Sequence, residues 1–201
     1  MSIYGLKPRF QALLRPATRT LCNAGVTANQ VTLAACILSI AVAAVILLNP
    51  ERPRLFLLVP LWFFLRMALN AIDGMLAREF GQASKLGAYL NEITDVLSDA
   101  ALYLPFAFVP GSSLAAVALV IGLSIISEYA GVLGLMVKAS RRYDGPMGKS
   151  DRAFVFGALG LAIGLGAAVA AAMPWVLGVV AVLVAVTIVN RVRRGLAEAG
   201  A

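Results

Sequence analysis

Residues 70–95 read NAIDGMLAREFGQASKLGAYLNEITD, and this stretch places carboxylates and amides against two long apolar runs of the chain. Ionisable side chains within membrane helices are costly, so they usually mark a functional site. On a helix, positions 70, 73 and 77 share one face, and positions 87, 91 and 95 share another. Two helices that turn oxygen ligands towards each other build a site for a hard cation. The stretch therefore predicts such a site between two neighbouring helices.

The composition indicates an integral membrane protein. The chain has 201 residues, of which 61% are hydrophobic. A soluble domain of this length would not carry so much apolar surface, whereas repeated apolar runs of roughly 20 residues are typical of transmembrane helices. The start of the chain is basic and only moderately apolar, so we expect no cleavable signal peptide.

The apolar runs predict an all-α integral membrane protein with six transmembrane helices. Their approximate bounds are 29–49, 55–77, 86–109, 112–137, 153–172 and 174–190. The sequence from Thr27 to Gln30 has the T-x-x-Q form of a capping box, which would start the first span. We divide the chain into a juxtamembrane segment, residues 1–26, and a six-helix membrane domain, residues 27–201.

The juxtamembrane segment is predicted to be an interfacial amphipathic helix on the cytoplasmic leaflet. Apolar residues recur in it at helical spacing between positions 3 and 14, and basic residues lie between them. Pro16 should end or kink this helix, because proline has no backbone N–H to donate, so we expect a short helix.

The charge pattern predicts the orientation in the membrane. The formal net charge is +7, and basic residues of membrane proteins accumulate in cytoplasmic loops. With six spans, fourteen of the seventeen basic residues fall on one side, so both termini should be cytoplasmic. Because topology accounts for the charge, we expect the lipid bilayer and not nucleic acid as the partner. Some of these residues could also attract anionic lipid or a phosphorylated substrate.

Two residue types narrow the possible chemistry. The chain has no His, which removes Ser-His-Asp triads and His-based zinc and haem sites. Its two cysteines, Cys22 and Cys36, are too few for a disulfide framework or a four-thiolate cluster.

The polar stretch resembles the motif of the CDP-alcohol phosphotransferase family, D-x2-D-G-x2-A-R-x8-G-x3-D-x3-D. All eight fixed positions have the right spacing, and six match in identity, while Asn70 and Asn91 replace the first and third aspartates. The resemblance extends to three further segments, Thr27-Ala28-Asn29, Ser127-Glu128-Tyr129 and Gly148-Lys149-Ser150-Asp151-Arg152. As a whole, the chain resembles a small subgroup of this family from the bacterial inner membrane.

The resemblance implies transfer of a phosphatidyl-type group from a CDP-linked lipid, such as CDP-diacylglycerol, to an alcohol acceptor, with release of CMP in phospholipid biosynthesis. In the family, the four motif aspartates bind two divalent cations. With Asn70 and Asn91 in place of two of them, one or two Mg²⁺ or Mn²⁺ ions would be held by Asn70, Asp73, Asn91 and Asp95. The CDP moiety would be held by Gly74, Ala77, Arg78 and Gly87. The acceptor phosphate would be bound by Lys138, Arg141, Lys149 and Arg152. Divalent ions suit this chemistry because a pyrophosphate needs cations to offset its charge during displacement.

The two asparagines complicate catalysis. The resemblance implies that the third motif position, Asn91, is the base, and we take Asp95, Asn91 and Asp99, one turn beyond Asp95, as the candidate catalytic residues. An amide can ligate through its carbonyl oxygen, but it adds no negative charge and cannot act as a base. Asp99 or Glu92 would then have to serve as the base, or the acceptor would supply its own base, such as a phosphate.

Other functions stay open at this point. The chain could be a catalytically impaired protein that binds CDP-lipid, a small transporter or a structural membrane protein. The fixed spacing of Gly74, Ala77 and Arg78 favours a nucleotide site over a transporter. The pattern Gly160-x3-Gly164 predicts tight helix packing, within the protomer in preference to a homodimer.

Overall fold

The structure is a computed structural model that describes residues 6–200, and all regular secondary structure in that part of the chain is helical. This confirms the predicted all-α class. The first five residues of the expected amphipathic segment lie outside the described residues. The α-helices are α1 Leu6–Asn23, α2 Ala28–Leu47, α3 Leu58–Glu79, α4 Lys85–Tyr103, α5 Leu114–Leu133, α6 Lys149–Gly164 and α7 Met173–Ala199. The shorter 3₁₀ helices are η2 Pro53–Leu57, η3 Leu104–Phe108 and η4 Gly134–Val137.

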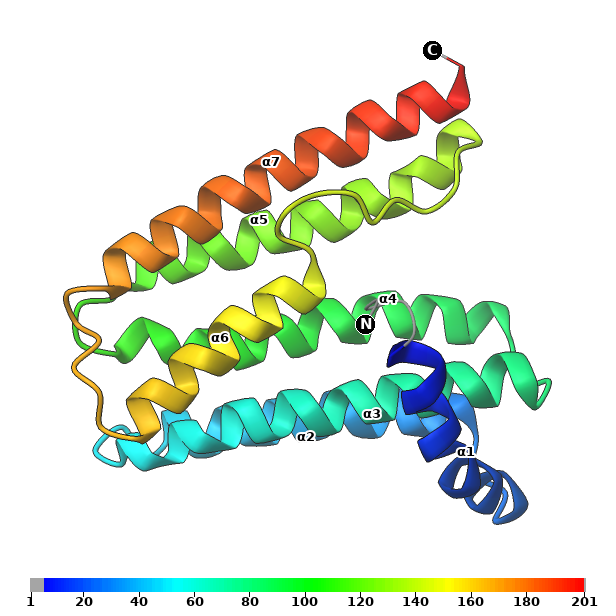
Figure 1. Cartoon of the computed structure of the whole chain (residues 1–201), viewed down its shortest axis with the longest axis horizontal. Coiled ribbons are helices and arrows are strands. Elements are labelled where there is room, and N and C mark those ends of the chain that lie inside the picture. Colours follow the sequence, from blue (N-terminus) through cyan, green and yellow to red (C-terminus); the bar gives the residue numbers. More distant parts are fainter. Residues whose placement is uncertain (1–5, 201) are drawn as a thin grey trace.

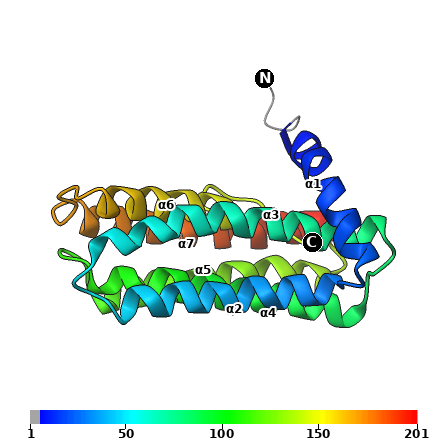
Figure 2. The same ribbon diagram turned by 90° about the horizontal axis from the view of Figure 1, so that it is seen from below.

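Helices α2 to α7 form one bundle in which successive helices alternate in direction (Figure 1). The α2–α3, α4–α5 and α6–α7 connections lie at one end of the bundle. The α3–α4 connection and the C-terminal end of α7 lie at the other, from which α1 projects sideways (Figure 2). We call these the opposite end and the α1 end. The alternation brings α1 and the end of α7 to the same end of the bundle.

Within residues 6–200, four helical segments are long and apolar enough to cross a membrane. They are Ala28–Leu47, Pro53–Glu79, Leu114–Val137 and Met173–Ala199. Helix α4 differs because Glu92, Asp95 and Asp99 interrupt its apolar character. Helix α6 differs because it has only 16 residues, fewer than the ~20 that span a bilayer. The expectation of six transmembrane helices therefore stays a prediction.

Helix α6 departs most from its expected bounds, 153–172. It begins earlier, at Lys149, and ends at Gly164. The early end follows from Gly166, whose φ of +86° is a left-handed conformation that closes the last turn. The α5–α6 connection runs back from the α1 end towards the middle of the bundle, where α6 starts (Figure 1).

The start of α2 confirms the predicted capping box. The Gln30 backbone N–H donates to Thr27 Oγ1 at 3.2 Å, and the Thr27 N–H donates to Gln30 Oε1 at 2.8 Å. The expectation of a short N-terminal helix is wrong, because α1 continues through Pro16 and has 18 residues in all. The packing of Leu14 and Leu21 against α2 and α3 holds the helix together beyond the proline.

An aromatic cluster fills the core towards the opposite end. Tyr103 stacks on Phe156 with ring centroids 4.0 Å apart, and Phe106 meets Phe156 edge-on at 5.0 Å. All three side chains are completely buried. Aromatic pairs of this kind contribute about 0.5–1.5 kcal/mol beyond the area they bury. Apolar contacts therefore hold this part of the bundle, which leaves the polar residues of α3 and α4 for the α1 end.

Helix α6 packs against η2 and the start of α3 along a seam of small residues. A Cβ atom on Gly160 would lie 2.9 Å from the Phe56 carbonyl oxygen, and one on Gly164 would lie 2.5 Å from Leu57 Cγ. Glycine is needed at both positions because the two backbones approach so closely. This confirms that the small-x3-small pattern packs within the protomer.

Candidate functional site

A cavity of about 1020 Å³ lies near the α1 end, between the C-terminal half of α3 and the N-terminal half of α4. Its lining includes all eight positions of the motif that the sequence displays between Asn70 and Asp95. Helices α2, α5 and α7 and the segment before α6 complete the walls. The site is therefore shared by almost the whole bundle.

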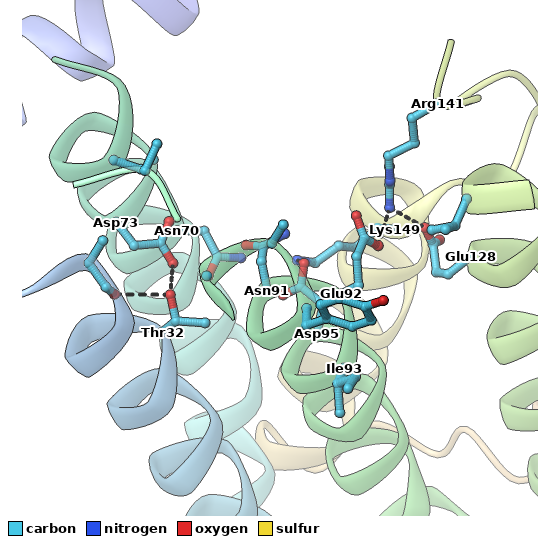
Figure 3. Close-up of a pocket in the computed structure, with 18 of the residues that line it drawn as sticks. Thr32, Asn70, Asp73, Asn91, Glu92, Ile93, Asp95, Glu128, Arg141 and Lys149 are labelled. Carbon is cyan, nitrogen blue, oxygen red and sulfur yellow. Dashed lines mark hydrogen bonds and ion pairs between the residues drawn. The ribbon is translucent and has the colours of Figure 1, made fainter. Parts of the chain in front are cut away.

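The predicted oxygen ligands do face one space. Asn70 and Asp73 come from α3, Asn91 and Asp95 come from α4, and their side chains form one row across the two helices (Figure 3). Spacings of three and four residues keep each pair on one face of its helix. The facing arrangement expected from the sequence is thus present in the structure.

The two carboxylates of this row have different partners. Asp73 is buried and accepts a hydrogen bond from the Thr32 hydroxyl at 2.8 Å (Figure 3). Asp95 lies between two cations, with Arg66 Nη2 3.1 Å from Oδ1 and Lys149 Nζ 2.5 Å from Oδ2. Asp73 thus has a neutral partner, whereas both oxygens of Asp95 are engaged by positive charge.

The residues expected to hold a nucleotide also line the cavity. They are Gly74, Ala77, Arg78 and Gly87. The Arg78 guanidinium folds back over Gly74, where an added Cβ would lie 2.5 Å from Nη2. An added Cβ on Gly87 would lie 2.8 Å from Asn29 Oδ1. A side chain at either glycine would therefore displace a neighbouring side chain that itself reaches the cavity or borders it.

The four basic residues predicted for an acceptor phosphate separate into two pairs. Arg141 and Lys149 line the cavity. Lys138 is exposed at the end of η4 and lies outside the lining. Arg152 is completely buried and also lies outside it. Only the first pair is placed to meet a molecule in the cavity.

Arg141 is held at the cavity wall by acidic side chains. Its Nη2 lies 2.7 Å from Glu92 Oε2 and 3.4 Å from Glu128 Oε2 (Figure 3). Burial alone would lower the pKa of Arg141, but the hydrogen bond and charge of Glu92 raise it above its ordinary value. Arg141 therefore stays charged.

Asp99, named as a possible catalytic residue, is not brought together with the others. It is buried one turn below Asp95 and does not line the cavity. Its carboxylate pairs with Arg66 Nη1 at 2.5 Å and with Arg152 Nη2 at 3.4 Å. Since Arg66 also contacts Asp95, Asp99 is placed to position other side chains.

Glu128 on α5 is the centre of the remaining charge network. Its carboxylate lies within 3.4 Å of Arg141, 3.0 Å of Arg152 and 3.2 Å of Arg191. These arginines come from the α5–α6 connection, α6 and α7. One carboxylate in the cavity wall thus ties three segments together.

Sequence reasoning did not single out Thr32 or Arg191 as site residues. Thr32 reaches Asp73 across a separation of 41 residues, and Arg191 meets Glu128 from α7. Thr32 lies one helical turn after Ala28 of the Thr27-Ala28-Asn29 segment. That segment indicated that the start of α2 is part of the family pattern, but it did not indicate that Thr32 contacts Asp73. Helical spacing describes one helix, so it cannot identify contacts between helices.

The cavity contains oxygen donors that could hold a divalent cation. Among residues 6–200 no group of three or more His, Cys, Asp or Glu side chains is arranged to hold a metal ion. Carboxylate and amide oxygens from four positions do line the cavity, and such oxygens are ligands that Mg²⁺ and Mn²⁺ prefer. With Asn70 and Asn91 in place of aspartates, only two of these positions carry a negative charge.

One family model and several known proteins are similar to this chain. The model described as CDP-alcohol phosphatidyltransferase matches residues 25–193. Inner membrane protein YnbA of Escherichia coli (strain K12) is 50% identical over 165 residues, which cover 82% of each chain. Phosphatidylinositol phosphate synthase of Corynebacterium glutamicum is 33% identical over 103 residues, or 51% of this chain and 45% of that protein.

Solved structures share the fold. Phosphatidylinositol phosphate synthase (PgsA1) of Mycobacterium tuberculosis with CDP-DAG bound has a TM-score of 0.74 at 22% identity, over 90% of this chain and 92% of that chain. The same enzyme in complex with manganese and citrate has a TM-score of 0.73 at 21% identity, over 90% and 87%. The likeness covers nearly the whole bundle.

Proposed function

The chain belongs to the CDP-alcohol phosphatidyltransferase family, and we propose that it transfers a phosphatidyl-type group from a CDP-linked lipid, such as CDP-diacylglycerol, to an alcohol acceptor. In this reaction the acceptor oxygen forms a bond to the lipid-side phosphorus. The bond from that phosphorus to the CMP oxygen breaks, the hydroxyl proton is lost, and CMP leaves. The observation that carries the proposal is the cavity lined by all eight motif positions.

We assign the donor nucleotide to the side of the cavity formed by Gly74, Ala77, Arg78 and Gly87. Small side chains let a flat base and a ribose approach the helix backbones. The guanidinium of Arg78, which lies over Gly74, presents paired N–H donors that match phosphate oxygens. The lipid tails would remain among the apolar helix faces while the head group enters the cavity.

A divalent cation, Mg²⁺ or Mn²⁺, fits beside Asp73, with Asn70, Asn91 and Asp95 as further oxygen donors. When bound, it would offset pyrophosphate charge during the displacement. The mycobacterial enzyme, whose structures contain manganese in one case and CDP-DAG in another, supports both expectations.

We assign the acceptor to the basic wall, where Arg141 and Arg191 line the cavity. An acceptor that carries a phosphate would match this charge. Asn91 cannot remove the hydroxyl proton, and Asp99 is occupied by two arginines. We therefore favour the acceptor's own phosphate as the proton carrier, with Glu92 as the alternative in the chain.

We further propose that the protein spans a bacterial inner membrane six times, with both termini in the cytoplasm. The relative from Escherichia coli is an inner membrane protein. Helices α4 and α6 would be the two additional spans, since they run within the bundle between apolar helices (Figure 2). A homodimer stays a prediction. The transporter and the structural membrane protein lose support from the family assignment.

A second candidate is a catalytically impaired protein that binds CDP-lipid. The observation in its favour is that Asn70 and Asn91 remove two negative charges, while both oxygens of Asp95 are already paired. Such a site would still accept the nucleotide through Arg78. The two candidates differ only in turnover.

Release of CMP by the purified protein tests the proposal. CDP-diacylglycerol would be offered with a panel of phosphorylated and free alcohols, in Mg²⁺ or Mn²⁺. We expect metal-dependent release that is lost in Asp73→Asn. The matched control is Glu51→Gln, an exposed carboxylate between α2 and η2, which should match wild type. CDP-lipid binding without release for any acceptor would support the impaired protein instead.

A further inference from the structure

Lys149 occupies an unusual place for a lysine. It is the first residue of α6, directly after the cap residue Gly148. The N-terminus of a helix carries partial positive charge, so a cation there is unfavourable by about 0.3–1 kcal/mol at exposed sites. Asp151, in the same turn, is the type of residue that suits this position. Helix stability therefore does not explain why residue 149 is a lysine.

The side chain of Lys149 is directed at the motif. Its ammonium lies 2.5 Å from Asp95 Oδ2, and both side chains are only partly exposed, by 30% and 23%. An ammonium group has three N–H donors, and one contact with Asp95 leaves others for a ligand. Lys149 also lines the cavity, so its free donors face the space in which the reaction is proposed to occur.

The carboxylates in and next to the motif differ in whether they form ion pairs. Asp95 is paired with Lys149, and Asp99 is paired with Arg66. Asp73 is the one motif carboxylate that forms no ion pair with any residue in the described part of the chain. A motif with four aspartates would have balanced two divalent ions, but here a single unpaired carboxylate remains.

We propose that the Lys149 ammonium takes over the charge role of one divalent ion, so that the protein binds a single divalent ion beside Asp73. This inference rests on the proposed function. Lys149 then donates to a pyrophosphate oxygen of the CDP-lipid from the Asp95 side, and the bound ion acts from the Asp73 side. It makes Lys149 a catalytic residue for the donor, and leaves the acceptor to Arg141 and Arg191, which also line the cavity.

The number of bound ions tests this directly on the wild-type protein. Mn²⁺ binding to the purified full chain in detergent, with CDP present, is measured by titration calorimetry and by the electron paramagnetic resonance spectrum. We expect one Mn²⁺ per chain and no dipolar broadening from a neighbouring ion. Two ions, or none, would overturn the inference, and this measurement needs no variant that has to fold.

Lys149→Met then locates the contact. We expect CDP affinity to fall at least about tenfold, because a charge-assisted hydrogen bond is lost, while Mn²⁺ affinity is retained or improved. The matched control is Lys138→Met, which removes the same charge from an exposed lysine outside the cavity and should change neither value. Unchanged CDP affinity in Lys149→Met, with only a raised KM for the acceptor, would overturn the assignment.

A gain-of-site variant completes the set. Asn70→Asp, Asn91→Asp and Lys149→Met together restore four carboxylates and remove the ammonium, so we expect two bound Mn²⁺. One ion in this variant would contradict the inference. Failure of the proposed function is distinguishable: a protein that binds one Mn²⁺ and CDP but releases no CMP keeps this inference and loses the transferase.

Discussion

Asp73 and Asp95 stand at matching places on facing helices, but only one of them is held by a neutral group. The Thr32 hydroxyl fixes the orientation of Asp73 without cancelling its charge. Arg66 and Lys149 fix Asp95 by compensating its charge. At the scale of single residues, the site is therefore asymmetric, and Thr32 contributes to it although it lies outside the motif.

Replacement of Thr32 by Val removes the hydroxyl and keeps the branched shape. Partners that orient a metal ligand typically change metal affinity by about 10–100-fold, so we expect Mn²⁺ binding to weaken about tenfold. Titration calorimetry on the purified protein measures this. Thr32→Ser keeps the hydroxyl and should bind like wild type. Equal affinity in the Val variant would show that Thr32 does not hold Asp73.

A Cβ on Gly74 would meet the Arg78 guanidinium, so any side chain there must move Arg78. Gly74→Leu displaces Arg78 and fills the nucleotide side of the cavity, so we expect CDP affinity to fall at least about tenfold, as for the loss of a charge-assisted contact. The control is Gly122→Leu in α5, where nothing lies within 4 Å of an added Cβ. Size-exclusion profiles should show that both variants fold, and undiminished CDP binding by Gly74→Leu would contradict the assignment.

At the scale of elements, Glu128 joins α5 to α6, to α7 and to the connection before α6. Removal of one partner from a buried ion pair costs about 3–5 kcal/mol, because charge is left uncompensated. Glu128→Ala should therefore lower the thermal unfolding midpoint in detergent strongly. Glu92→Ala, at a carboxylate that is 32% exposed and pairs with Arg141, should lower it much less. Equal midpoints for the two variants would refute this role.

Much of each element was predictable, because local rules apply within a helix. The capping box at Thr27 and the shared faces of α3 and α4 follow from spacing alone, and the structure has both. The fate of Pro16 was not predictable, because packing of α1 against α3 holds the helix despite the lost hydrogen bond. The length of α6 was misjudged because its apolar run continues past Gly164 into a turn.

The membership of the site was harder to predict than its location. Lys138, Arg141, Lys149 and Arg152 look alike in sequence, since all are basic residues between two apolar runs. Only tertiary packing separates Arg141 and Lys149, which line the cavity, from the other two. Arg152 instead forms buried ion pairs with Asp99 and Glu128. Contacts between helices are distant along the chain, and no periodicity encodes them.

At the scale of the whole molecule, polarity divides the bundle along its length. The buried aromatic cluster lies towards the opposite end, and the cavity with its ion pairs lies towards the α1 end. The head group of a CDP-linked lipid and free CMP are both water-soluble, so the proposed function requires the α1 end to face the aqueous compartment. The charge pattern of the chain predicts that this compartment is the cytoplasm.

Cysteine labelling in intact cells tests this orientation. In a chain with Cys22→Ser and Cys36→Ala, a single cysteine is placed at Arg52, between α2 and η2, or at Ala199, at the end of α7. We expect a membrane-impermeant maleimide to label Arg52→Cys and not Ala199→Cys. Both should react after the cells are opened. Labelling of Ala199→Cys in intact cells would reverse the topology and the position of the site.

The glycine seam of α6 sets a mechanical tolerance for chemistry at the far end of that helix. Gly164 lies fifteen residues from Lys149, or about 22 Å along the helix axis. A tilt of roughly 3° about the seam would swing the ammonium by about 1 Å, a displacement that can reduce an enzymatic rate about a hundredfold. The close packing at Gly160 and Gly164 therefore controls how accurately Lys149 is positioned, although both glycines lie outside the cavity.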